Sequence, residues 1–264
     1  MGSYPAVLII LLLLGALPAH AAPRQPRCIS CHAVHYADQG DCPTCHRGNV
    51  ATSRRELAHS GLISGRLASF RDLASPAVLR GKQLAEQSSC RRCHQLHRSG
   101  NRLASNLDNL LQSNTVETIA QAIAEPASSM PAFHFSQPDQ DALITALLAG
   151  GVGGMKPIKE PPQVVHFSSQ QTSRQNSFVK YCGGCHKLLS QQDGGLGQGT
   201  AGPNLSGLLS RFYPVTFQDH LPWTEQRLKR WLKNPRDTRP SAMMRPVTLE
   251  QEAWQQLLKT MRPK

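Results

Sequence analysis

Apolar residues are gathered in a few segments of the chain. The first is the run Val7–Leu17, broken only by Gly15 and followed by the small-x-small sequence Ala19-His20-Ala21. This run is shorter than the about 20 residues that a membrane-spanning helix needs, so it is typical of a cleaved signal peptide rather than an anchor. We therefore expect residues 1–21 to be removed after Ala21 and the mature protein to be soluble and exported to the periplasm.

Further along the chain, the spacing of apolar and polar positions predicts helices. They are expected at residues 54–59, 75–89, 114–124, 138–149, 174–181, 223–234 and 250–261. Thr115 and Thr224 stand at N-cap positions, and Pro126 follows the third of these segments, where it would stop the helix. The pattern therefore favours a helical protein with several short elements.

All eight cysteines fall in four copies of one motif, C-x-x-C-H. The copies are Cys28-Ile-Ser-Cys31-His32, Cys42-Pro-Thr-Cys45-His46, Cys90-Arg-Arg-Cys93-His94 and Cys182-Gly-Gly-Cys185-His186. An even number of cysteines in an exported chain would by default suggest disulfides, and paired cysteines also occur in zinc sites and redox dithiols. None of these alternatives needs a histidine directly after the second cysteine. The motif is the attachment signature of c-type haem, so we expect four covalently attached haem c groups.

Composition and charge fit this interpretation. Aromatic residues make up only 5% of the chain. Four porphyrins would supply flat apolar groups for the core in place of the few aromatic side chains. The formal net charge is +12, which favours an acidic partner, a nucleic acid or a membrane surface. Export and haem content exclude the nucleic acid, so we expect the charge to guide docking to acidic redox proteins.

The motifs and the composition divide the chain into modules. The expected parts are the signal peptide 1–21, a loop-rich dihaem module 22–72, a module 73–150, a Gly-, Pro-, Ser- and Gln-rich linker 151–172, and a module 173–264. The two later modules share one order: helix, C-x-x-C-H, loop, helix, methionine loop, helix. This order is an internal repeat.

With four motifs the chain resembles multihaem, specifically tetrahaem, c-type cytochromes. Its second and third modules each resemble a class I cytochrome c domain, which implies an all-α fold with His and Met axial ligands. The strings Gly202-Pro203-Asn204-Leu205 and Met130-Pro131 match that family. The second module departs from it with Ser105-Asn106-Leu107 in place of Gly-Pro-Asn-Leu, and the third lacks a proline directly after its methionines.

The resemblance implies that His32, His46, His94 and His186 each occupy one axial position. In the second module, Met130 is the expected second ligand, because it precedes the last helix and Pro131 stiffens its loop. In the third module both Met243 and Met244 are candidates. Met244 is favoured because its separation from the following helix matches that of Met130.

The first module contains no methionine, and its only histidines outside the motifs are His35 and His59. We interpret both of its haems as bis-His. His35 lies three residues after His32 and cannot easily reach the opposite face of the same haem. We therefore assign His35 to the Cys42/Cys45 haem and His59 to the Cys28/Cys31 haem, with the opposite assignment as the alternative.

With every axial position filled, the sequence favours an electron carrier over an enzyme. We expect electrons to pass between redox partner proteins, such as a membrane quinol-oxidising or b-type cytochrome complex, and a terminal acceptor system, with no small-molecule substrate. The alternative is a haem enzyme, peroxidase-like or oxidising sulfur compounds, in which one assignment is wrong and one haem has an open site. A structural role in a cytochrome polymer is disfavoured by the two separate class I-like modules.

Axial ligands also predict an order of potentials. Met/His ligation raises the potential of a haem, so the two haems of the first module should be the lowest, and electrons should enter there and leave through the later modules. A redox titration with spectral assignment of each haem tests this order. A lowest-potential haem in either later module would refute it.

Overall fold

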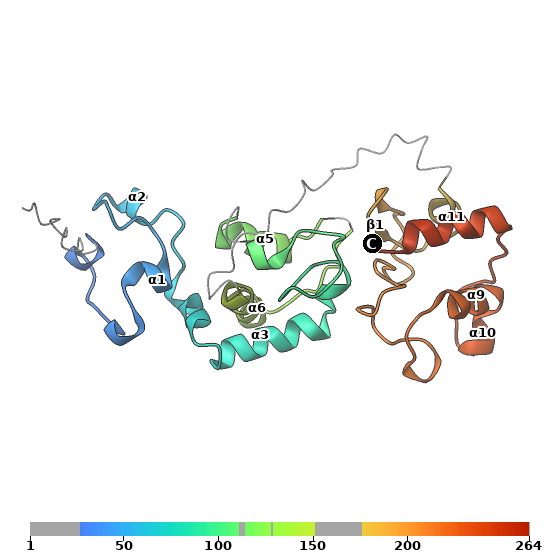
Figure 1. The fold of residues 1–264 in the computed structure, drawn as a ribbon, viewed down its shortest axis with the longest axis horizontal. Helices are drawn as coiled ribbons and strands as arrows, with labels where there is room; N and C mark the ends of the chain where they lie inside the picture. Colours follow the sequence, from blue (N-terminus) through green and yellow to red (C-terminus); the bar gives the residue numbers. More distant parts are fainter. Residues whose placement is uncertain (1–26, 111–113, 128, 151–175, 264) are drawn as a thin grey trace, which may run out of the picture.

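The computed structural model describes residues 27–110, 114–127, 129–150 and 176–263. The expected signal peptide 1–21 and linker 151–172 lie outside these residues. The fold is mostly helical, and three parts follow one another along its longest axis (Figure 1). No helix in the described ranges is long and apolar enough to cross a membrane.

The first part consists of short turns of helix. They are η1 (Arg27–Ser30), η2 (Ala37–Gln39), α1 (Cys42–His46) and α2 (Arg55–Ala58). No residue between 27 and 62 is buried. The predicted short helix at 54–59 is confirmed as α2, and this part has the loop-rich character that its polar composition predicts.

The segment after residue 62 joins the next part of the chain. Ile63, Leu67 and Phe70 are buried in one cluster with Val78 and Ile144. Leu67 and Phe70 belong to the 3-10 helix η3 (Gly65–Arg71). The sequence placed these residues in the module 22–72, whereas in the structure their apolar side chains contribute to the core of the second part.

The second part contains the helices that the sequence predicts, with small differences at their ends. They are α3 (Pro76–Gln87), α5 (Val116–Ala124) and α6 (Gln137–Gly150). Two short 3-10 helices that the sequence analysis did not predict, η4 (Cys90–Arg92) and η5 (Leu107–Asn109), lie between α3 and α5. Ser75 caps α3 by accepting the Val78 N–H, and Thr115 caps α5 by accepting the Thr118 N–H. These caps satisfy N–H groups that have no partner within the helix, and they therefore fix where each helix begins.

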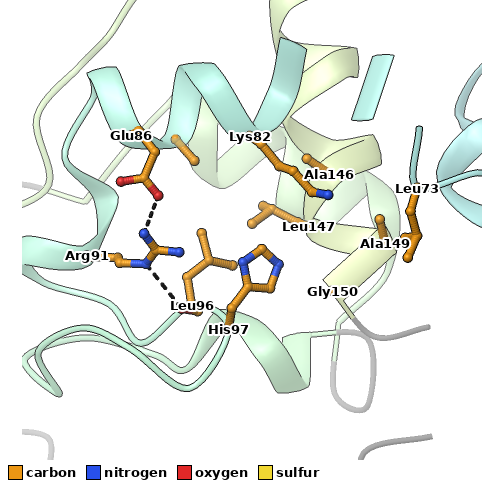
Figure 2. Close-up of a pocket in the computed structure, with 11 residues that line it drawn as sticks. Leu73, Lys82, Glu86, Arg91, Leu96, His97, Ala146, Leu147, Ala149 and Gly150 are labelled. Atoms are coloured by element: carbon orange, nitrogen blue, oxygen red, sulfur yellow. Dashed lines mark hydrogen bonds and ion pairs between the residues drawn. The ribbon is translucent and has the colours of Figure 1, made fainter. Parts of the chain in front are cut away.

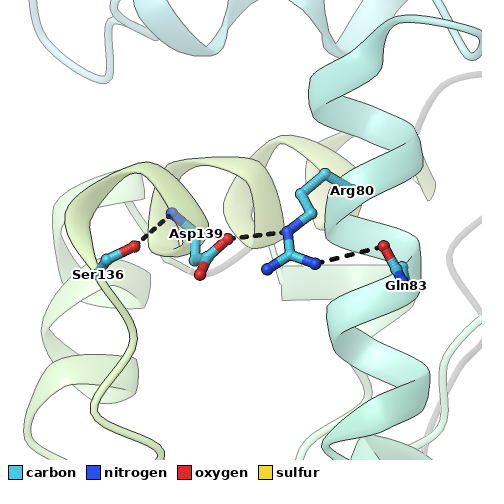
Figure 3. A network of polar contacts seen from close by, with 4 residues as sticks. All are labelled: Arg80, Gln83, Ser136 and Asp139. Carbon is cyan, nitrogen blue, oxygen red and sulfur yellow. Dashed lines mark hydrogen bonds and ion pairs between the residues drawn. The ribbon is translucent and has the colours of Figure 1, made fainter.

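Helices α3 and α6 cross closely. A Cβ at Gly81 would collide with the carbonyl group of Ala142, so only glycine allows this approach. Figure 3 shows a polar link on the surface of the same pair: Arg80 Nε donates to Asp139 Oδ1 at 2.9 Å, and Arg80 Nη1 donates to Gln83 Oε1 at 3.3 Å. The Arg80 hydrogen bond holds the pKa of Asp139 below its usual value.

The third part has its own core. It contains α8 (Ser177–Tyr181), β1 (Leu188–Ser190), β2 (Gly194–Leu196), η6 (Gln218–His220), α9 (Glu225–Lys233), α10 (Pro235–Thr238) and α11 (Gln251–Met261). Phe178, Leu228 and Leu257 from three of these helices are buried together. Thr224 caps α9 as predicted, and Asn176 caps α8.

One element corrects the all-α expectation. Strands β1 and β2 form an antiparallel hairpin, with Leu188 opposite Leu196. Gly194 has a φ of 72°, a conformation that favours glycine and suits a tight turn. Leu188 and Leu196 are both buried in the third core, so the hairpin is held by the same apolar burial as the helices.

The crossing of α3 and α6 predicts an effect of Gly81→Ala. The added carbon would push the helices apart, and we expect unfolding of the haem-loaded protein by denaturant to show a loss of about 1–3 kcal/mol. Gly65→Ala is the control, because nothing lies within 4 Å of its added carbon; it should change stability by less than about 0.5 kcal/mol. Equal losses in both variants would contradict the close approach.

Candidate haem-binding sites

Each C-x-x-C-H motif forms a single turn of backbone. The N–H of His32 donates to the carbonyl of Cys28 at 2.9 Å, and His94 and His186 make the same bond to Cys90 and Cys182 at 3.0 and 2.9 Å. The second motif forms α1 itself. The turn therefore places two thiols and one imidazole along one short stretch of chain, which is the arrangement that attachment of haem c needs.

The cysteine side chains are available for that attachment. None of the eight is paired in a disulfide. Burial raises the pKa of the Cys90 and Cys182 thiols to about 11. Within the part of the chain that the structure describes, no three His, Cys, Asp or Glu side chains come together as the ligands of a metal ion would.

Three motif histidines are oriented by a backbone carbonyl. His46 Nδ1 lies 3.0 Å from the Ile63 oxygen, His94 Nδ1 2.7 Å from the Ser105 oxygen, and His186 Nδ1 2.8 Å from the Pro203 oxygen. A carbonyl can only accept, so the proton lies on Nδ1 and the lone pair on Nε2 is left to bind a metal. Burial lowers the pKa of His94 against the opposing effect of its Ser105 bond, which favours the neutral form that ligation needs.

The carbonyls at Ser105 and Pro203 occupy equivalent positions in the two later modules. Asn106 accepts the N–H of Asp108, and Asn204 accepts the N–H of Ser206, so both loops turn in the same way. The segments Ser105-Asn106-Leu107 and Gly202-Pro203-Asn204-Leu205 therefore orient the motif histidine in the same way. In both, a backbone carbonyl accepts the histidine proton, and the proline ring is not needed for this contact.

The histidines of the first part lie in two pairs. The ring centroids of His32 and His59 are 6.0 Å apart, and those of His35 and His46 are 5.7 Å apart. Two metal–nitrogen bonds of about 2 Å each, with the ring centres about 1 Å beyond each nitrogen, would separate the centroids of two axial imidazoles by about 6 Å. The spacing thus fits an iron between the rings of each pair, in the pairing chosen from the sequence.

The methionine candidates differ in their surroundings. Met130 is half-buried. Met244 lies against the third core, and its Sδ accepts a hydrogen bond from Trp231 Nε1 at 3.0 Å. Met243 is 91% exposed. The structure thus holds Met244 in place inside its module and leaves Met243 in solvent.

A cavity of about 500 Å³ lies beside the third motif (Figure 2). Apolar residues of α3 and α6 form one wall, and Lys82, Arg91 and His97 bring basic groups to it. Both His97 and Arg98 have positive φ, and their N–H groups donate to the Asp108 carboxylate at 2.6 and 2.8 Å. No local sequence signal predicts this turn, because it depends on a carboxylate from a later loop.

Comparison with known families bears on the second part of the chain. Residues 76–147 match the family described as cytochrome C oxidase, cbb3-type, subunit III. The matched segment runs from α3 into α6 and contains the third motif and Met130. Neither the curated proteins nor the solved structures gave a match to the chain. Residues 76–147 are thus similar to a c-type cytochrome domain, and this match supports an electron-transfer protein with covalently bound haem c.

Proposed function

We propose that this chain is a periplasmic tetrahaem c-type cytochrome that carries electrons between a membrane quinol-oxidising or b-type cytochrome complex and a terminal acceptor system. The observation that carries the proposal is the single backbone turn formed by each of the four C-x-x-C-H motifs. For each motif the sequence also offers a candidate second ligand. Filled axial positions favour electron transfer over catalysis. Bound haem c would supply an iron that alternates between the ferric and ferrous states.

The chain itself would hold and orient these groups. His32, His46, His94 and His186 would bind on one side. The residues on the opposite side would be His59, His35, Met130 and Met244, in the same order. Hydrogen bonds from Nδ1 to backbone carbonyls fix the ring orientation of His46, His94 and His186. Hydrogen bonds of this kind also raise the basicity of a metal-binding imidazole.

The first part gives separate support, because it exposes apolar side chains that a soluble fold would otherwise bury. Val34 is 61% exposed and Tyr36 is 75% exposed. Both lie in the same loop as His35, between the first two motifs. Exposed apolar residues gathered in one place usually mark a surface that something covers, and two porphyrins beside this loop would cover them.

The net charge favours acidic partners. Complementary charge speeds encounter between proteins and sets their orientation more than it adds affinity. The formal charge of +12 therefore supports docking to an acidic face of a cytochrome or of a membrane complex.

The haem number and ligation are tested together on the purified, exported protein. Mass spectrometry and the pyridine haemochrome assay should give four haems per chain, and replacing Cys182 and Cys185 by serine should leave three. Low-temperature electron paramagnetic resonance of the oxidised protein should show only low-spin iron, of bis-His and His/Met type. A five-coordinate, high-spin haem in the resting protein would instead indicate the haem enzyme.

The two adjacent methionines provide a matched pair of variants. Met244→Ala should open one axial position, so that a high-spin signal appears and carbon monoxide binds one haem of the four. Met243→Ala should leave both spectra unchanged, because that side chain lies in solvent. The reverse result, measured by the same spectra, would assign the ligand to Met243.

A further inference from the structure

The second and third parts of the chain meet at the third haem-binding motif. Arg92, inside that motif, donates from Nη1 to the Asn204 carbonyl at 3.3 Å, and its guanidinium lies over the Tyr213 ring, 5.6 Å from the centroid. Asn101 donates from Nδ2 to Ser210 Oγ at 2.8 Å. These contacts join residues that are more than 100 positions apart in the sequence.

A second set of contacts joins the methionine loop of one module to the other module. Asn204 Nδ2 donates to the carbonyl of Ser129, which directly precedes Met130, at 2.8 Å. Both the motif, through Arg92, and the methionine loop of the second module thus contact Asn204, which directly follows Pro203.

The interface is close and its polar groups are satisfied. Gly207 has a φ of 73°, and a Cβ there would collide with the Arg92 carbonyl and lie 2.8 Å from Asn101 Nδ2. Asn101 is at least 90% buried, and its Nδ2 finds Ser210 Oγ across the contact. Tyr213 is buried to the same degree, and its hydroxyl donates to the Asn204 carbonyl within its own module. Buried polar side chains that find their partners across a contact favour one fixed arrangement over sliding.

A continuous path of covalent bonds and hydrogen bonds crosses this interface. Arg92 is the peptide neighbour of Cys93, which would carry a thioether. Across the interface, Asn204 is the peptide neighbour of Pro203, and the Pro203 carbonyl accepts the proton of His186 Nδ1 at 2.8 Å. The path from the third attachment site to His186 therefore contains two hydrogen bonds, two peptide links and the full length of the Arg92 side chain.

We propose that Arg92 and Asn204 lock the second and third modules into one rigid unit, and that this joint couples electron exchange between the third and fourth haems. The proposal rests on the tetrahaem function proposed above. In the exchange, one iron loses one electron and the other gains it. No covalent bond forms or breaks, no proton is transferred, and no further reactant is needed.

The two arginines of the motif provide a matched test. Arg92→Leu removes the contacts across the interface. Arg91→Leu removes a charge of the same sign from the adjacent position, where the guanidinium contacts Glu86 and the Leu96 carbonyl within its own module. Neither arginine is a haem ligand. Both variants are made in the full haem-loaded chain and compared with the unmutated protein.

The measurement is the rate of electron exchange between the two haems at partial reduction, from the exchange of their haem methyl proton resonances. Loss of a fixed geometry can cost a rate about tenfold or more, and we expect that loss in Arg92→Leu but not in Arg91→Leu. The midpoint potentials should shift alike, since each variant removes one charge. Equal exchange rates in both variants would overturn the proposal.

Two further measurements test the contact between the second and third modules. In the unmutated protein, nuclear Overhauser contacts should link the Arg92 side chain to the Tyr213 ring, and their absence would also overturn the proposal. Gly207→Ala should slow exchange in the same way, whereas Gly61→Ala should not, because Gly61 has a similar φ of 68° and nothing within 4 Å of an added carbon. Fewer than four haems per chain would contradict the proposed function itself, whatever the rates.

Discussion

The turn that links two cysteines to the next histidine is the constraint on which the rest of this structure depends. The turn places the imidazole, but it does not by itself orient the ring. In three of the motifs the carbonyl that does so comes from 11 to 17 residues further along the chain. A motif can therefore present its Nε2 correctly only after the following loop has folded, so ligation and folding of a module are coupled, as in other small metal-binding domains.

The three parts differ in how much apolar burial is available to stabilise their folds. The second and third parts each bury an apolar cluster, the second with α3, α5 and α6 and the third with α8, α9 and α11. The segment 27–62 buries no residue at all. A segment without a core cannot offset the conformational entropy lost on folding by apolar burial. We infer that its fold would come mainly from the two proposed haems, whereas the later modules have apolar cores of their own.

Local signals predicted local structure well. Thr115 and Thr224 mark helix starts that the structure confirms, because a cap is a bond within a few residues. The features that escaped prediction depend on distant contacts. Phe70 lies in a polar stretch, and only the core of the second part shows why it is buried; the β1–β2 hairpin owes its place to the third core. By contrast, the sequence analysis already paired His35 with His46, whose ring centroids lie 5.7 Å apart, and their binding of one iron stays a prediction.

Arg91 and Arg92 show most clearly where sequence reasoning stops. They are identical neighbours in one motif, yet one contacts its own module and the other reaches the next. A turn sends successive side chains in different directions, so the second module alone could not tell which arginine would find a partner. The loop from Pro203 to Ser206 supplies that partner, and the same loop orients His186. A segment that both aims an axial ligand and contacts the neighbouring module cannot shift without disturbing both, and this shared constraint is the physical reason to regard the two modules as one unit.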